Sequence, residues 1–227
     1  MSGFTRFWII LFVALALLFI YDPKIDLQAA SLFYKEGTFY LADNPLVQFL
    51  YHYSPWFAVG VGIVSLGMLV ADFISKKEYF GIRRKVWAYL LLALLLGPGL
   101  VVNFVFKEHW GRARPVQVTQ FGGEKNFTPA FIPANQCSHN CSFSCGHASN
   151  GFYFIALALL AKKHRWLWLT LATLFGFLIG AGRMAQGGHF LSDVIFSFFF
   201  VLFTSLLLYR WFFGREEKER QKDLNDA

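Results

Sequence analysis

The stretch FLSDVIFSFFFVLFTSLLLYRWFF, residues 190–213, is apolar at most of its 24 positions and carries one carboxylate near its start. A helix needs about 20 mostly apolar residues to cross the hydrocarbon core of a bilayer. Residues 55–74 and 86–106 meet the same requirement. These three segments predict membrane-spanning helices and set the fold class of the chain.

Three shorter apolar runs lie at 7–21, 148–161 and 166–181. Such runs can span if flanking polar side chains reach the interface or if the bilayer is locally thin. The first run also resembles a signal-peptide core, but Tyr21-Asp22-Pro23 is a poor cleavage context and favours a retained helix. We therefore expect an all-α integral membrane bundle of six transmembrane helices, forming a single domain over residues 1–227.

The composition supports a bilayer as the main partner of the chain. The 227 residues are 56% hydrophobic and 15% charged, whereas soluble domains carry about 25% charged residues. The net charge of +7 could indicate nucleic-acid binding, but in so apolar a chain basic residues more often fix membrane orientation. We therefore expect no nucleic-acid partner.

Lys and Arg residues are divided unequally between the two sides of the six expected spans. The side that holds both termini and the connections 75–85 and 162–165 carries 14 of them, and the opposite side carries 7. The positive-inside rule therefore predicts that both termini and a solvated tail, 214–227, are cytoplasmic. The segments 22–54, 107–147 and 182–189 face outward.

Two local features interrupt this pattern. Gly97-Pro98-Gly99 falls inside the third span, where proline removes a backbone donor, so we expect a packing kink there. Residues 116–143 have no periodicity. We expect this segment to be a loop whose aromatic side chains lie on the membrane interface above a lipid substrate: Phe121, Phe127, Phe131 and Phe143.

The outward segments carry cations that the orientation rule does not require. Lys107 and Arg114 follow the third span, and Arg183 follows the fifth. Arginine offers a planar fork of donors that matches phosphate oxygens, and lysine a compact charge. Gly146 opens the fourth span, where backbone N–H groups at a helix start favour an anion. Together these residues predict a phosphate pocket.

Two histidines accompany these cations. His147 opens the fourth helix, and His189 and Asp193 are four residues apart at the start of the sixth, on one helical face. A carboxylate that holds one ring nitrogen orients an imidazole and raises its basicity, which suits a nucleophile or base. Ionisable groups so close to a span are costly and usually functional.

The three cysteines all lie in CSHNCSFSCGHASNGF, residues 137–152. Zinc binding by Cys137, Cys141 and two histidines has suitable ligand types, but it would remove His147 from the phosphate pocket. A cysteine phosphatase needs an arginine six positions after the cysteine, and none is present. A disulfide between Cys137 and Cys141 suits an oxidising outer face. Cys145 would then be the remaining thiol.

Three motifs follow one another on successive outward segments: K-x6-R-P at 107–115, C-G-H at 145–147 and G-R-x5-H-x3-D at 182–193. They resemble the patterns K-x6-R-P, P-S-G-H and S-R-x5-H-x3-D of the type 2 phosphatidic acid phosphatase superfamily. The resemblance covers about residues 55–213 in topology. It implies a six-helix membrane phosphatase that needs no metal or other cofactor.

The resemblance also implies roles for individual residues. His189 would attack phosphorus and form a phosphohistidine, with Asp193 orienting it. His147 would protonate the leaving oxygen and then activate water. The expected phosphate-binding set would hold the phosphoryl oxygens and stabilise the transition state: Lys107, Arg114, Arg183 and the Gly146 amide.

Two positions depart from the family pattern. Ser144-Cys145 stands where the pattern has Pro-Ser, and Gly182 where it has Ser. Cys145 therefore occupies the place of a phosphate-binding hydroxyl, and a thiol is a weaker donor. We expect an altered pocket that is still active.

Within the superfamily, residues 107–115 and 140–149 most resemble bacterial lipid A phosphatases. This implies removal of a phosphate from lipid A at the periplasmic face of the bacterial inner membrane. Undecaprenyl diphosphate or phosphatidylglycerophosphate as substrate, and phosphoryl transfer to a second lipid, stay open as alternatives. So does the oligomeric state. A transporter is disfavoured because few ionisable groups lie near mid-span, and a non-catalytic membrane module is the remaining rival.

Overall fold

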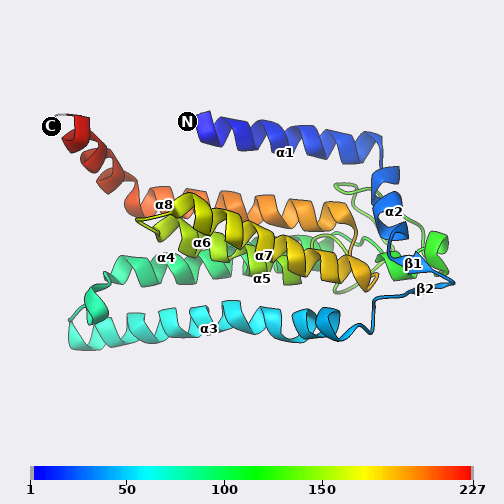
Figure 1. Ribbon diagram of the computed structural model, residues 1–227, viewed down its shortest axis with the longest axis horizontal. Helices are drawn as coiled ribbons and strands as arrows, with labels where there is room; N and C mark the ends of the chain where they lie inside the picture. The colour runs from blue at the N-terminus through cyan, green and yellow to red at the C-terminus, as the bar shows by residue number, and fades with distance from the viewer. Residues whose placement is uncertain (1–2, 226–227) are drawn as a thin grey trace.

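The computed structural model describes the backbone of residues 3–225 and the side chains of residue 3 and residues 5–216. The chain is mostly helical (Figure 1). Its longer elements are α1 (Gly3–Tyr21), α3 (Pro45–Ser75), α4 (Arg84–Leu94), η2 (Leu95–Lys107), α7 (Arg165–Ala185) and α8 (Leu191–Asn225). The shorter ones are α2 (Lys24–Ser31), β1 (Tyr34–Lys35), β2 (Thr38–Phe39), η1 (Tyr79–Gly81), η3 (Pro115–Gln117), η4 (Thr119–Phe121), α5 (Gly146–Phe152) and α6 (Phe154–Leu160).

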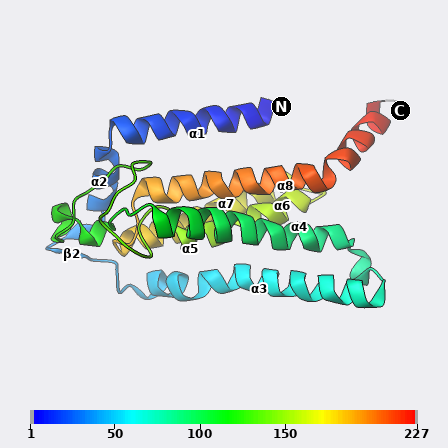
Figure 2. The same cartoon turned by 180° about the vertical axis from the view of Figure 1, so that it is seen from behind.

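The long helices run alongside one another, with α1 and α3 on opposite sides of a central group that includes α8 (Figures 1 and 2). The start of α1, the α3–α4 connection and the end of α8 lie at one end of the bundle. The other end holds α2, the antiparallel hairpin β1–β2 and the irregular segment 108–145. This division puts every sequence-predicted site residue at the end opposite the termini.

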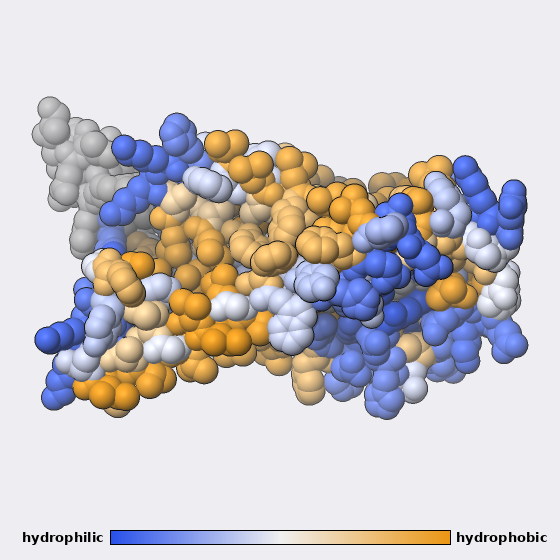
Figure 3. All heavy atoms as spheres, turned by 60° about the horizontal axis from the view of Figure 1, so that its bottom comes forward, coloured by the Kyte–Doolittle hydropathy of each residue, from blue (hydrophilic) through white to orange (hydrophobic). Residues whose placement is uncertain are grey.

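The helices that are long and apolar enough to cross a membrane are Pro45–Ser75, Arg84–Lys107, Arg165–Ala185 and Leu191–Glu216. A fifth is formed if α1 and α2, bent by 85° at their junction, are one span. The expected span 148–161 is divided between α5 and α6, each of seven residues. Helical segments occupy all six predicted positions, but length and apolarity support four or five spans. An apolar belt lies between polar ends (Figure 3).

The helix over the second expected span begins at Pro45, ten residues before the predicted boundary. Its start is explained by Asn44, whose side chain accepts hydrogen bonds from the backbone N–H groups of Leu46 (3.0 Å) and Val47 (3.4 Å). Proline at the first helical position loses no intrahelical bond. The segment between the first two long helices is therefore shorter than predicted and contains α2 and the hairpin.

The third span changes its hydrogen bonding where the sequence predicts a kink. Regular α-helix ends at Leu94, and residues 95–107 form a π-helical stretch around Pro98. The Asn103 side chain donates to the Pro98 carbonyl at 2.7 Å. Gly97 packs close to α8, where a Cβ would lie 3.8 Å from the Val201 Cα. That is an ordinary van der Waals contact, so the packing at this point would also accept an alanine.

The prediction that the loop aromatics lie on the membrane interface is wrong. Phe121 and Phe143 are buried. The Phe131 ring packs against Phe196 at 4.5 Å and against Phe143 at 5.2 Å between centroids. Periodicity could not reveal this, because an irregular segment buries its side chains without a repeat.

The tail predicted at 214–227 is not entirely free of the bundle. Glu216 forms ion pairs with Arg83 (2.7 Å) and Lys85 at the α3–α4 connection. The helix α8 continues to Asn225. Residues 226–227, and the side chains beyond residue 216, lie outside the described part of the chain.

Candidate active site

His189 lies in the short turn between α7 and α8, where it is fully buried. Gly187 adopts a φ of +64°, a left-handed conformation that glycine accepts without strain. At Gly188 the Arg183 guanidinium packs so closely that a Cβ would lie 2.9 Å from Arg183 Cζ. The two glycines of the motif therefore hold His189 and Arg183 side by side.

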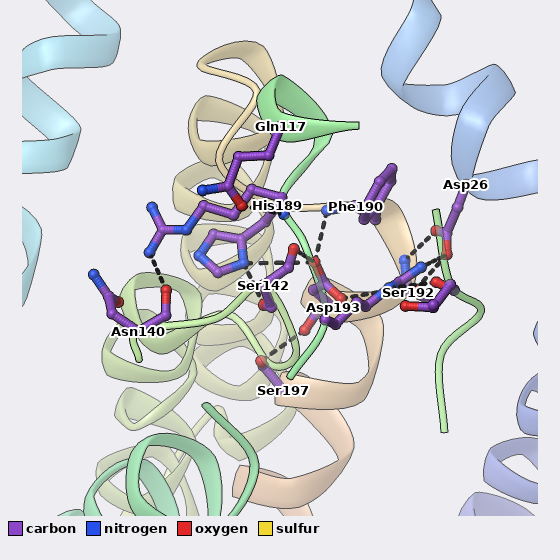
Figure 4. A network of polar contacts seen from close by, with 12 residues as sticks. Asp26, Gln117, Asn140, Ser142, His189, Phe190, Ser192, Asp193 and Ser197 are labelled. Atoms are coloured by element: carbon purple, nitrogen blue, oxygen red, sulfur yellow. Dashed lines mark hydrogen bonds and ion pairs between the residues drawn. The ribbon is translucent and has the colours of Figure 1, made fainter. Parts of the chain in front are cut away.

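The two ring nitrogens of His189 have different surroundings (Figure 4). Nδ1 lies 2.7 Å from the Ser142 carbonyl oxygen and 3.6 Å from Asp193 Oδ2. Since both neighbours are acceptors, Nδ1 carries the proton and Nε2 the lone pair. Within the described residues Nε2 has no hydrogen-bond partner. Burial lowers the pKa of His189 to about 4, so the ring is neutral at pH 7.

Asp193 is buried and held by several donors. It accepts hydrogen bonds from Ser142 Oγ at 2.5 Å and from the Phe190 N–H at 2.7 Å. The Asp193 carbonyl accepts the Cys145 N–H at 3.2 Å, which ties the start of α5 to the start of α8. Asp193 therefore holds the histidine turn through its carboxylate and the start of the glycine-histidine motif through its backbone carbonyl.

Arg112 is the ion-pair partner of Asp193 and was not among the sequence-predicted site residues. It is fully buried, 2.5 Å from Asp193 Oδ1 and 2.7 Å from Asp26 Oδ2. It also donates to Ser192 Oγ at 2.9 Å and to the Thr128 carbonyl at 2.8 Å. The guanidinium thus uses its fork of donors to join α2, the irregular segment 108–145 and α8.

The predicted phosphate-binding residues gather around the two histidines. Lys107 is beside Gly146, where a Cβ would lie 3.2 Å from Lys107 Nζ. Gly146 is the first residue of α5, so its N–H has no partner within the helix. Arg114 is half-buried, and its guanidinium donates to the Asn140 carbonyl at 2.7 Å.

His147 and Arg183 both contact one aromatic ring, that of Tyr51. The His147 ring stacks on Tyr51 of α3 at 4.8 Å, and the Arg183 guanidinium lies over the same ring at 4.5 Å. Burial, and after it the charge of nearby Arg183, lowers the pKa of His147 to about 3. His147 is therefore neutral at pH 7.

The three cysteines have two different environments. Cys137 and Cys141 are joined by a disulfide with a Cα–Cα distance of 5.6 Å. Cys145 is a free, buried thiol whose pKa is raised by burial, so it stays protonated at neutral pH. Among the described residues, no group of three or more His, Cys, Asp or Glu side chains is placed to hold a metal ion.

Sequence reasoning missed four contributors to this site: Arg112, Asp26, Ser142 and Tyr51. Arg112 stands inside the K-x6-R-P motif and was counted only as one outward cation. Asp26 and Tyr51 come from distant segments, and Ser142 acts on His189 through its backbone carbonyl. One signal for Arg112 was available in the sequence: it lies two residues from Arg114. Because an unpaired cation next to a bilayer is costly, this second arginine indicated a buried ion-pair partner.

An apolar helical bundle with two histidines and several cations at one end is typical of membrane enzymes that act on phosphate esters. Residues 86–217 match the model of the PAP2 superfamily. The chain is 37% identical to a lipid A 4'-phosphatase of Francisella tularensis subsp. novicida over 221 residues, covering 94% of this chain and 99% of the relative. Two rhizobial lipid A 4'-phosphatases are also similar. That of Rhizobium leguminosarum is 41% identical over 65% of each chain, and that of Rhizobium etli is 42% identical over 51% of this chain and 46% of the relative.

No solved structure shows a significant match to the chain. The family match covers more than half of the residues, and the Francisella relative is matched over nearly its whole length. The chain belongs to the PAP2 superfamily. It is a phosphoric ester hydrolase of the lipid phosphatase class. It is also a multi-pass bacterial membrane protein.

Proposed function

We propose that this protein removes the 4'-phosphate of lipid A through a phosphohistidine intermediate, without a metal ion. The substrate proposal is supported by three relatives that are named lipid A 4'-phosphatases. The observation that carries the mechanism is His189: a buried, neutral imidazole with Nδ1 held and Nε2 unpaired among the described residues. That arrangement is suited to nucleophilic attack.

In the first step the Nε2 lone pair of His189 forms a bond to phosphorus while the bond to the sugar oxygen breaks. Nδ1–H stays with the Ser142 carbonyl and Asp193, which stabilise the positive charge that develops on the ring. His147 donates its proton to the departing oxygen. In the second step His147 takes a proton from water, whose oxygen bonds to phosphorus while the bond to His189 Nε2 breaks; inorganic phosphate leaves and the Nε2 lone pair is restored.

His147 can act as an acid only if it gains a proton when substrate binds. Before substrate binds, burial and nearby cations keep its pKa at about 3. A bound phosphate dianion offsets those cations, and an opposite charge nearby raises the pKa of an imidazole. Substrate binding therefore supplies the protonation state that the first step needs.

Three cations and one backbone amide hold the phosphoryl oxygens and stabilise the charge of the transition state: Lys107, Arg114, Arg183 and the Gly146 N–H. Cys145 contributes only a weak S–H donor beside them. The Gly146 amide and the cations carry the binding in its place.

We propose that six helical segments cross the bacterial inner membrane, with α5 and α6 together forming the fourth span, in a single domain of residues 1–227. Both termini are cytoplasmic, and the active site faces the periplasm. This is supported by the twofold excess of Lys and Arg on the termini side. It is also supported by the start of α5 and the α7–α8 turn, which carry His147 and His189 and lie at the opposite end of the bundle.

The test is phosphate release from lipid A by purified protein in detergent, with and without a chelator. We expect activity that survives chelation and falls at least about 1,000-fold in His189→Ala and His189→Gln. His139→Ala is the matched control, since the His139 side chain is 86% exposed. Activity abolished by chelator and restored by zinc would overturn the mechanism, and absence of release from lipid A would overturn the substrate.

A further inference from the structure

A cavity of about 400 Å³ lies at the outer end of the bundle, beside the histidine turn and not inside it. Its walls come from the hairpin β1–β2, the segment 40–43, the 3₁₀ turns η3 and η4, and Gln186. The hairpin and the η turns lie together at that end of the molecule (Figures 1 and 2). Its size is within the range of sites for small organic ligands.

The cavity is joined directly to the reactive residues. Gln186 lines it and also accepts a hydrogen bond from the Arg183 guanidinium. The Phe39 ring packs on Gly187 so closely that a Cβ there would lie 2.8 Å from Phe39 Cγ. The Val116 N–H donates to the Gly187 carbonyl at 3.0 Å. A group attached to a phosphate held by Arg183 therefore has this cavity as its neighbour.

Three aromatic rings give the cavity a rigid apolar wall. Tyr34 and Phe39 of the hairpin and Phe121 of η4 contact one another edge to face, with centroids 5.2 to 5.6 Å apart. A fourth ring, Tyr40, lines the cavity and is 47% exposed, with the Lys35 ammonium over one face at 4.9 Å from the centroid. Flat exposed rings suit the apolar C–H face of a sugar.

The polar groups of the cavity are hydrogen-bonding side chains, and the only charged one in its described lining is Asp43. Thr38 and Gln186 offer a hydroxyl and an amide. The Gln48 side chain donates to the Ala42 carbonyl at 2.8 Å and so fixes the backbone next to Asp43. A carboxylate accepts hydrogen bonds from hydroxyl or amide groups but repels a second anion. The lining therefore suits a neutral, hydroxyl-rich group better than another phosphate.

We propose that this cavity binds the sugar to which the scissile phosphate is attached, and that it sets selectivity for phosphorylated glycolipids over glycerophospholipid phosphates. The inference rests on the proposed function and names the part of the substrate that is recognised. An acylated glycerol backbone has no ring face to pack on the aromatic wall and no free hydroxyl or amide for Asp43, whereas an N-acylated hexosamine has a ring face and an amide N–H. Tyr40 and Asp43 are thus specificity-determining residues outside the reactive set.

The experiment compares wild type with Tyr40→Ala and Asp43→Asn in detergent. Each protein is assayed on lipid A, on phosphatidic acid and on p-nitrophenyl phosphate. We expect kcat/KM for lipid A to fall at least tenfold, while the values for the other two substrates stay within about twofold. Tyr21→Ala and Asp22→Asn are the matched controls, since both residues are exposed and neither lines the cavity.

An equal loss on all three substrates, or no loss on lipid A, would overturn the inference. The failure of the proposed function has a different signature: wild type would cleave phosphatidic acid or p-nitrophenyl phosphate but not lipid A. Thermal unfolding of each variant accompanies the assay. A folded variant that keeps full activity on p-nitrophenyl phosphate shows that any selective loss arises from recognition.

Discussion

At the scale of single residues, the site depends on the different surroundings of the two ring nitrogens of His189. The Ser142 carbonyl and Asp193 keep the proton on Nδ1, and burial keeps the ring neutral. A charged imidazole has no lone pair to offer phosphorus. The residues that lower the pKa of His189 are thus as necessary to the chemistry as those that bind phosphate, and Arg183 serves both purposes.

The acid limb of the pH profile should report this neutral imidazole. Protonation of His189 removes the nucleophile, so kcat/KM should fall as pH decreases through about 4. With a pKa of about 4, roughly 3% of the His189 side chains are protonated at pH 5.5. With an ordinary histidine pKa of about 6.5, roughly 90% would be protonated and the enzyme would be largely inactive. The profile should be measured with two phosphate esters of different acidity, because only the limb belonging to the enzyme stays fixed. A fixed limb near pH 6.5 would contradict the assignment.

At the scale of elements, one ion-pair network joins parts of the chain that are distant in sequence. Arg112 of the irregular segment 108–145 contacts Asp26 of α2 and Asp193 of α8. The Ser192 N–H and hydroxyl also donate to Asp26, at 2.8 and 2.6 Å. Because all these groups are buried, removing one partner leaves charges without compensation. The network therefore couples the position of α2 to the orientation of Asp193.

Replacement of Arg112 should affect stability and catalysis together. Arg112→Ala leaves Asp26 and Asp193 buried without their cation, and we expect a loss of about 3 to 5 kcal/mol in the free energy of unfolding. We also expect kcat for the remaining folded protein to fall, because Asp193 is no longer held. Arg83→Ala is the matched control: its ion pair with Glu216 is half exposed, and such pairs contribute at most about 1 kcal/mol. Thermal unfolding in detergent measures the difference, and equal losses in both variants would contradict this account.

The sequence contains most of the reactive set and less of what supports it. Lys107, His147 and His189 lie in short motifs whose spacing reflects neighbouring helix ends, so local reasoning finds them. Arg112 and Asp26 are 86 positions apart. Their pairing depends on the 85° bend between α1 and α2. No local sequence pattern predicts that angle. The buried loop aromatics were mispredicted for the same reason, because tertiary packing and not periodicity decides their burial.

At the scale of the whole molecule, the fourth span decides the topology. The pieces α5 and α6 are each seven residues long, so neither crosses a bilayer alone. If they act as one span, the connection 161–164 lies on the side of the termini, as its lysines favour. If the pair did not cross, this connection would have to lie on the side of the histidines, whereas in the structure Lys162 and Arg165 line a pocket with Arg83 and Glu216 at the other end of the bundle. The two arrangements differ in the side from which Lys163 can be reached.

Cysteine labelling distinguishes these arrangements in the full-length chain. Cys145 is buried and Cys137 is bonded to Cys141, so a new exposed cysteine is the one expected to react. Thr119→Cys places it on the outer loop and Lys163→Cys on the α6–α7 connection, both at exposed positions. With a membrane-impermeant maleimide on spheroplasts, we expect Thr119→Cys to be labelled at once and Lys163→Cys only after permeabilisation. Labelling of Lys163→Cys in intact spheroplasts would place both positions on one side. That result would contradict both the fourth span and the position of Lys162 and Arg165 beside Arg83 in the structure.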